Sequence, residues 1–440
     1  MVPLDPSDVR QAAVRRDAWE PGLGAVVEWL DPPLEGAPRG PLAGVILGVK
    51  DLLAVAGVRR VCGAPDLTDP APQSVHATAV ARLLDAGATV VATLALHQFA
   101  YGLVTPQVGN PRAPGRVAGG SSGGSAAALA TGMVQGSLGT DTGGSVRIPA
   151  ACCGVVGLKT TRGLVPLTGV QPLAPSLDTV GPMARSVAEA GVLLDAIAGY
   201  DPADDHSVEA APAPDPPPLA QLRLGVPTQV RAMRMDPDVR GVWEATLEML
   251  AAAGARVTSV DVPALEGAAT ANGQVLGAEA ALIHGDRLAA HADRFWPDVR
   301  ARLERGRELR ATDLAAAHGH AARLRAQVRT VFGDVDVLVT PTLPCVVPAV
   351  GADPVVVDGH AEAVVGVLTR FTNPWNLAGV PAGSVPAGVD AAGAPVGVQV
   401  VGPWFAEPVV LAVMAAIEDL RGGPWPIEPA PGLPRPPAAG

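Results

Sequence analysis

The sequence predicts an α/β fold in which a large mixed β-sheet is covered on both sides by α-helices. Short apolar runs rich in β-branched residues, such as residues 45–49 and 89–94, are typical of buried strands. They alternate with longer segments of helical periodicity, such as residues 187–197 and 239–253. This alternation favours parallel or mixed strands with helices packed over them. An apolar fraction of 48% with 17% charged residues indicates an extensive interior.

The N-terminal region is predicted to be helical. Apolar positions recur at helical intervals through residues 9–14 and again through residues 25–30. Proline-rich breaks at residues 32–33 and 38–41 should end these helices, because proline cannot continue a helix.

A buried strand follows, and then a unit made of one helix and one strand. The strand at residues 45–49 ends at Lys50 and Asp51, so these two polar groups lie where the strand emerges. Residues 76–86 have helical periodicity and are followed by Gly87, a residue suited to a C-cap. The second strand begins directly after it.

The rest of the chain continues the alternation. The further predicted elements are helices at 125–133, 187–197, 239–253 and 272 to about 331, and strands at 222–226, 257–262, 335–339 and 396–401. Residues 201–218, dense in proline and aspartate, predict an exposed connection, and residues 424–440 predict a loose tail. No internal repeat is visible, so we expect one domain over residues 1–440.

Charge and cysteine content exclude several classes of protein. A net charge of -11 disfavours nucleic acid or an anionic membrane surface as the main partner, since both require clustered Lys and Arg. No apolar stretch reaches the roughly 20 residues that span a bilayer. The four cysteines lack CxxC spacing, which is typical of reduced thiols in a cytoplasmic protein.

Lysine is almost absent from the chain. Of the 32 basic residues only Lys50 and Lys159 are lysines, and the others are arginines. Arginine keeps its proton near neutral pH, whereas a desolvated lysine can lose it. A lysine retained in such a chain is therefore a candidate for amine chemistry, with packing as the alternative reading.

Two glycine–serine segments are the densest chemical signal. The first is Gly119-Gly120-Ser121-Ser122-Gly123-Gly124-Ser125, which runs into an alanine-rich helix rather than continuing as a flexible linker. The second, Gly143-Gly144-Ser145, can present adjacent N–H donors to one oxygen, as an oxyanion hole requires. Asp141 and Arg147 flank this second turn at a spacing that lets them pair across it.

A serine nucleophile needs a base, and no histidine lies in these segments. A neutral lysine is the known alternative, and Lys50 lies where a strand emerges. The pair His318 and His320 lies in an alanine-rich helix without an acidic cluster, so we expect no metal site there.

The motifs together resemble the amidase signature family. The resemblance is specific, and it is strong from about residue 44 to 197 and moderate from 335 to 402. It rests on Gly48-Val49-Lys50-Asp51, on residues 119–125, on Asp141-Thr142-Gly143-Gly144-Ser145, on Gly157-Leu158-Lys159 and on Asn376-Leu377-Ala378-Gly379. It implies a single amidase domain with a signature core at about 44–200, a variable helical region at about 268–331 and a C-terminal part of the core at about 335–420.

The resemblance implies a role for each residue of the motifs. Ser145 is the expected nucleophile, Ser121 the bridging serine next to a cis peptide bond, and Lys50 the terminal base. The backbone of Thr142, Gly143, Gly144 and Ser145 is expected to form the oxyanion hole. Ser122, Asp141 and Arg147 are expected to support these groups, Lys159 is expected to be structural or supporting, and no cofactor is implied.

The expected reaction is hydrolysis of the C–N bond of a small-molecule amide, with a homo-oligomer left open. The amidase-type subunit of a glutamine-dependent aminoacyl-tRNA amidotransferase is an alternative. Those subunits typically place an acidic residue just ahead of the Pro-x-Asn-Leu-Ala-Gly segment, whereas this chain has Thr369-Arg370-Phe371-Thr372-Asn373-Pro374. A serine esterase is the other alternative, because residues 119–123 also fit G-x-S-x-G with Ser121 as nucleophile, although no strand is expected before them.

Overall fold

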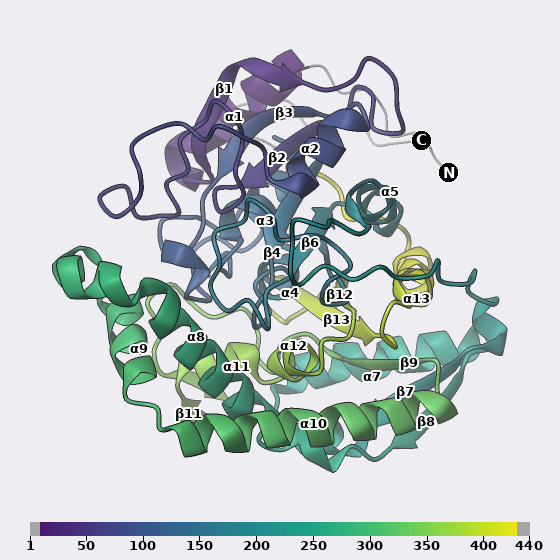
Figure 1. Ribbon diagram of the computed structural model, residues 1–440. Helices are drawn as coiled ribbons and strands as arrows, with labels where there is room; N and C mark the ends of the chain where they lie inside the picture. Colours follow the sequence, from purple (N-terminus) through teal and green to yellow (C-terminus); the bar gives the residue numbers. More distant parts are fainter. Residues whose placement is uncertain (1–8, 429–440) are drawn as a thin grey trace.

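One mixed sheet forms the centre of the protein. The structure is a computed structural model that describes residues 9–428, and within them eleven strands join in the order β1-β3-β2-β4-β6-β5-β12-β13-β9-β7-β8 (Figure 1). A separate hairpin pairs β10 with β11. The strands are β1 (Val26–Glu35), β2 (Ile46–Lys50), β3 (Thr89–Leu94), β4 (Gly136–Thr140), β5 (Val156–Lys159), β6 (Val180–Ala184), β7 (Arg223–Pro227), β8 (Arg256–Val260), β9 (Val337–Pro341), β10 (Val355–Val357), β11 (His360–Glu362), β12 (Ala382–Val389) and β13 (Pro395–Val401).

The sheet has parallel strands near both edges and antiparallel strands in its middle. Strands β3, β2 and β4 run parallel to one another, as do β9, β7 and β8. The strands between them, β4-β6-β5-β12-β13-β9, pair antiparallel. The predicted mixed sheet is therefore confirmed. Since β2 and β4 are parallel neighbours, their carboxyl ends meet at one edge of the sheet.

Helices cover both faces of the sheet, as the sequence predicts. They are α1 (Val9–Leu23), α2 (Thr78–Asp85), α3 (Gly123–Ala130), α4 (Arg147–Cys153), α5 (Val187–Ile197), α6 (Thr228–Ala232), α7 (Pro237–Ala252), α8 (Ala268–His291), α9 (Pro297–Arg307), α10 (Ala311–Asp334), α11 (Val364–Thr369), α12 (Asn373–Ala378) and α13 (Glu407–Leu420). Helices α2, α5, α13 and α7 contact one another in that order along one face. Helices α3 and α4 lie on the other. On β4, Gly136 faces Leu193 of α5 whereas Gly139 faces Ser122 at the start of α3.

A helical lobe stands beside the sheet. Helices α8, α9, α10 and α12 pack together; in Figure 1, α8 and α9 appear in green at the lower left and α10 runs along the bottom. The predicted helix from residue 272 to about 331 is thus three helices, and α9 begins with Pro297, a residue favoured at the first helical position. No helix among residues 9–428 is both long and apolar enough to cross a membrane.

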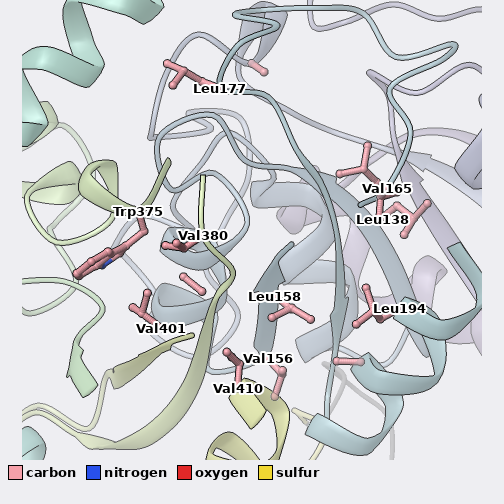
Figure 2. Close-up of a cluster of buried hydrophobic side chains, with 14 of the residues drawn as sticks. Leu138, Val156, Leu158, Val165, Leu177, Leu194, Trp375, Val380, Val401 and Val410 are labelled. Atoms are coloured by element: carbon pink, nitrogen blue, oxygen red, sulfur yellow. The ribbon is translucent and has the colours of Figure 1, made fainter. Parts of the chain in front are cut away.

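The hydrophobic core lies between the sheet and its helices. Figure 2 shows part of it, with Leu138 of β4, Leu158 of β5, Val401 of β13, Leu194 of α5 and Val410 of α13 as members of one buried cluster. This packing fixes the ends of β2, β4 and β5, where the chemically interesting residues lie.

The predicted helix at residues 25–30 is wrong, because this segment belongs to the edge strand β1. Five residues between Val26 and Glu35 pair with β3, and the register shifts between Trp29 and Leu34. Pro32 and Pro33 lie in that irregular part, where an edge strand tolerates residues that cannot donate. The predicted tail at 424–440 lies outside the described residues from position 429 onward, and its first part contacts the protein through Arg112 and Glu428.

Candidate active site

The ends of β2 and β4 bring Lys50 beside Thr140. Val49 pairs with Leu138 in the parallel register, so the residues that follow on both strands are neighbours. Lys50 is fully buried, and its Nζ donates to Thr140 Oγ1 at 2.8 Å and to Ser121 Oγ at 2.7 Å. The structure therefore joins two of the three residues expected to form the proton relay. Thr140, which the sequence analysis missed, is the second acceptor for Lys50.

The first glycine–serine segment forms a tight loop over residues 119–122 and then begins α3 at Gly123. Its Gly120–Ser121 peptide bond is cis, as the resemblance implied. Gly119 has φ +76, and a Cβ there would lie 2.8 Å from Pro149 Cα, so this position requires glycine. Ser121 is fully buried, and Ser122 directs its hydroxyl to the Thr140 carbonyl at 3.4 Å and its N–H to the Ser145 carbonyl at 3.3 Å. Ser122 thus links the loop to both neighbouring segments.

The charge state of Lys50 follows from its surroundings. Burial lowers the pKa of Lys50 to about 7, although the carboxylates of Asp141 and Asp178 oppose the shift. An ordinary lysine has a pKa of about 10.4 and is almost entirely protonated near neutral pH. A substantial fraction of Lys50 is therefore neutral near pH 7, and a neutral amine can accept a proton.

Asp141 and Arg147 form a buried ion pair across the second glycine–serine turn. Their side chains are fully buried and approach to 2.9 Å, so the predicted pairing is confirmed. Burial by itself would raise the pKa of Asp141, but the Arg147 guanidinium and the amide of Asn376 hold it well below its ordinary value. Asn376 donates to the Asp141 carboxylate at 2.7 Å. Further donor hydrogens of Arg147 bind Gln399 Oε1, Asn376 Oδ1 and the Thr372 carbonyl.

This ion pair changes the prediction for the oxyanion hole. The Gly144 N–H donates to the Asp141 carboxylate at 2.8 Å, so the geometry does not support Gly144 as an oxyanion donor. Within the described residues, the N–H groups of Thr142, Gly143 and Ser145 have no acceptor. The Thr142 hydroxyl donates to Asp178 Oδ1 at 2.5 Å and fixes the start of the turn. Gly144 thus orients the turn, and its neighbours offer the free donors.

Ser145 opens onto a cavity that the described residues form. The cavity has a volume of about 660 Å³, and Ser145 lines it, whereas Lys50 and Ser121 lie behind its wall. Ser145 makes no side-chain hydrogen bond to Ser121 in the described part of the chain. The walls come from residues 100–103, from the turn at 142–145, from α8 and α9, and from residues 353–373.

The remaining polar candidates have structural partners. Lys159 is fully buried, but its Nζ donates to the backbone carbonyls of Thr160 and Val380, each at 2.8 Å. His320 contacts the Ala264 carbonyl at 2.8 Å. Asn376 and Gln399, for which the sequence predicts no chemical role, accept hydrogen bonds from Arg147. Asn376 lies within a motif that was recognised, but only the folded contacts show its partner.

Comparison with known proteins places the chain in a family. It matches the Amidase family over residues 28–411. An amidase from Pseudomonas putida is 39% identical over 364 residues, which cover 81% of this chain and 77% of that protein. A glutamyl-tRNA(Gln) amidotransferase subunit from Haloarcula marismortui is 38% identical over 427 residues, which cover 88% of this chain and 98% of that protein.

Solved structures agree with this assignment. A crystal structure of an amidase superposes with a TM-score of 0.82 and 34% identity, and covers 93% of this chain and 95% of its own. A chain from a vestigial protein complex that reveals the origins of an s-triazine catabolic enzyme superposes with a TM-score of 0.88 and 29% identity, over 94% of this chain and 95% of its own. The chain therefore belongs to the amidase family and is a hydrolase that acts on amides.

Proposed function

We propose that the protein cleaves the C–N bond of a carboxylic acid amide through an acyl-serine intermediate, and releases ammonia or an amine. In this proposal Ser145 is the nucleophile, Ser121 the bridging serine and Lys50 the base. The observation that carries the proposal is the hydrogen bond of 2.7 Å between the buried Lys50 amine and the Ser121 hydroxyl. A buried amine that touches a serine and is partly neutral near pH 7 is suited to base catalysis.

The mechanism follows from these positions. Ser145 Oγ attacks the amide carbon while its proton passes to Ser121, whose own proton passes to Lys50. The developing oxyanion is stabilised by the free N–H groups of Thr142, Gly143 and Ser145. The relay then runs backward: Lys50 returns the proton through Ser121 to the leaving nitrogen, and the C–N bond breaks. Water attacks the acyl-serine by the same route.

Ser145 must turn toward Ser121 when the substrate is seated, since the two hydroxyls are not hydrogen-bonded in the described structure. Such contacts are often loose before substrate binds. The proposal treats residues 1–440 as one amidase domain, because a single sheet draws strands from both ends of the chain. Helices α8 and α9 of the helical lobe line the cavity, so they would contact the amide substrate and determine which amides are accepted.

The amidase-type subunit of a glutamine-dependent amidotransferase is the second candidate, because a glutamyl-tRNA(Gln) amidotransferase subunit is among the similar proteins. The cavity lining argues against glutamine as the ammonia donor. Thr369, in the stretch where those subunits typically carry an acid, offers a hydroxyl, and Asp353, one of the two acids that line the cavity, already accepts the Val364 N–H at 3.1 Å. Asp298, a second acid of the cavity, already accepts a hydrogen bond from Arg302 at 2.7 Å, and its carboxylate lies 3.0 Å from His97 Nε2.

An esterase with Ser121 as its nucleophile fits the geometry poorly. Ser121 is fully buried and absent from the cavity wall, and the segment before it is irregular rather than a strand. A fluorophosphonate probe separates the two serines. We expect labelling at Ser145, detected by peptide mass spectrometry, and none in the Ser145→Ala variant.

The decisive experiment for the function is a panel of small amides, ureas and amino-acid amides, with released ammonia as the readout. We expect the wild type to hydrolyse at least one class and the Ser145→Ala variant to lose on the order of 10⁶-fold in kcat. Far-UV circular dichroism checks that the variant is folded. Retention of activity in folded Ser145→Ala would refute the proposed nucleophile.

A further inference from the structure

Two buried carboxamides beside the turn at Gly143 lack hydrogen-bond partners. Asn272, on α8, is fully buried, and neither its Oδ1 nor its Nδ2 has a partner within the described residues. Asn373, the first residue of α12, is 6% exposed, and its Oδ1 also has no partner there. Buried polar atoms are nearly always paired, because an unpaired one has lost its hydration without compensation. Two such side chains at one place point to a missing ligand.

Both side chains lie against the segment that offers the free N–H donors. A Cβ placed on Gly143 would lie 2.6 Å from Asn373 Oδ1 and 3.7 Å from Asn272 Nδ2. Asn373 lines the cavity into which Ser145 opens. The unpaired oxygen of Asn373 therefore lies beside Gly143, whose free N–H is proposed to bind the oxygen of the scissile carbonyl.

The orientation of the Asn373 side chain is fixed by its other end. Its Nδ2 donates to the Ala269 carbonyl at 3.4 Å, in the first turn of α8. Reversing the carboxamide would set two acceptors against each other, so the oxygen remains on the side of Gly143. An oxygen in this place repels an oxyanion and can only accept a hydrogen bond. Its complement is an N–H group next to the scissile carbonyl.

We propose that Asn373, with the buried Asn272 beside the same glycine, recognises an N–H on the nitrogen bound to the scissile carbonyl. The enzyme would then select primary and monosubstituted amides or ureas, which keep such a hydrogen, over tertiary amides and esters, which do not. This inference rests on the proposed function, because it takes Ser145 as the nucleophile. It assigns Asn373 as a residue that determines specificity, whereas the proton relay is unchanged.

A purely structural pairing is the competing explanation. Small rotations could let the two carboxamides bond to each other and tie α8 to α12. In that case a substitution of either asparagine would lower kcat/KM for all substrates alike, since only the shape of the site would change. Replacing Asn272 and Asn373 together would then lower activity less than replacing one of them, because no buried carboxamide would be left unpaired.

The test uses one acyl group that the enzyme accepts, presented as its ethyl ester, primary amide, N-methyl amide and N,N-dimethyl amide. In the wild type we expect kcat/KM for the dimethyl amide to fall by about tenfold or more below that of the N-methyl amide, because a buried acceptor loses its donor. Equal turnover of the N-methyl and dimethyl amides by the wild type would overturn the proposal.

The Asn373→Leu variant separates a lost hydrogen bond from steric exclusion. We expect its ratio of amide to ester kcat/KM to fall by about tenfold or more while ester hydrolysis persists. Asn272→Leu, on a different helix, should lower the same ratio less. Gln274→Leu is the matched control, since Gln274 lines the same cavity from α8 but is not among the atoms nearest Gly143. Its ratio should stay at the wild-type value.

Three outcomes are decisive. A selective loss of amide hydrolysis in Asn373→Leu supports recognition of the N–H. A parallel loss of amide and ester hydrolysis, relieved in the Asn272→Leu/Asn373→Leu double variant, overturns it in favour of structural pairing. If Ser145→Ala still hydrolyses the ester and the amide, the proposed function itself fails, whatever the asparagine variants do.

Discussion

The surroundings of Lys50, at the end of β2, and of Lys159, at the end of β5, are alike in most physical respects. Both side chains are fully buried. Burial lowers the pKa of each lysine to about 7, with Arg147 adding to the shift at Lys159. These are the only two lysines in the chain. By burial and pKa alone, each is equally suited to accept a proton near neutral pH.

Their hydrogen-bond partners differ. Lys50 donates to two hydroxyls, those of Ser121 and Thr140, whereas Lys159 donates to two backbone carbonyls. A hydroxyl can give up its own proton and pass on another, but a carbonyl has none to give. A lowered lysine pKa therefore indicates a candidate base, and the chemistry of the partner decides whether that base is connected to a reaction.

The largest effect that separates the two lysines should come from replacing Lys50. We expect Lys50→Arg and Lys50→Ala each to lower kcat/KM for amide hydrolysis by roughly 10²–10⁴-fold, because Arg keeps its proton and Ala has no amine. The measurement is steady-state release of ammonia, with circular dichroism as the folding control. An Arg variant with most of the wild-type activity would show that Lys50 acts only as a positive charge.

Thr140→Val should have a smaller effect. Valine has a similar shape but cannot accept the hydrogen bond from Lys50, so kcat/KM should fall by about tenfold. Losing an acceptor destabilises the protonated amine, which lowers the pKa of Lys50 further. The rising limb of activity with pH should accordingly move to lower pH. An unchanged pH midpoint would mean that Thr140 does not help to set the pKa of Lys50.

Lys159→Met should give the smallest loss of activity of the three and act on stability instead. It leaves the Thr160 and Val380 carbonyls without their donor, at a cost of about 1–3 kcal/mol at pH 7. The pKa of Lys159 is lower in the folded protein, so the unfolded chain binds more protons above about pH 7 and this lysine makes stability rise with pH. The variant lacks that contribution.

Urea unfolding at pH 7 and pH 8.5 measures this difference between wild type and variant. The variant should become progressively less stable relative to the wild type as the pH rises. A relative stability that is independent of pH would contradict the assigned pKa of Lys159. A loss of activity as large as that of Lys50→Ala would remove the distinction between the two lysines.

The sequence predicts several contacts of the candidate site, because the residues that make them lie in short segments with fixed spacing. The pairing of Asp141 with Arg147 and the strand that ends at Lys50 follow from local pattern. The contacts of Thr140 with Lys50 and of Asn376 with Asp141 join segments distant in the chain. No spacing rule reveals such contacts, although parallel strands ending together suggest that residues after β4 should lie near Lys50.

Contacts in the folded chain correct two of the predictions made from the sequence. Gly144 was expected to donate to an oxyanion, but its N–H points to the carboxylate of Asp141, three residues earlier. Residues 25–30 were expected to be helical, since a short apolar run fits either period. Pairing with β3 decides for a strand, and that pairing depends on a segment more than fifty residues away.

The pH dependence of Ser145 acylation tests most directly the claim that neutral Lys50 is the base of the relay. With a fixed amide substrate, wild-type kcat/KM should rise about tenfold per pH unit below the pKa of Lys50, near 7, and level off above it. The residual activity of Lys50→Ala should lack this inflection. An inflection near pH 7 that persists in Lys50→Ala would assign it to another group and contradict the proposed relay.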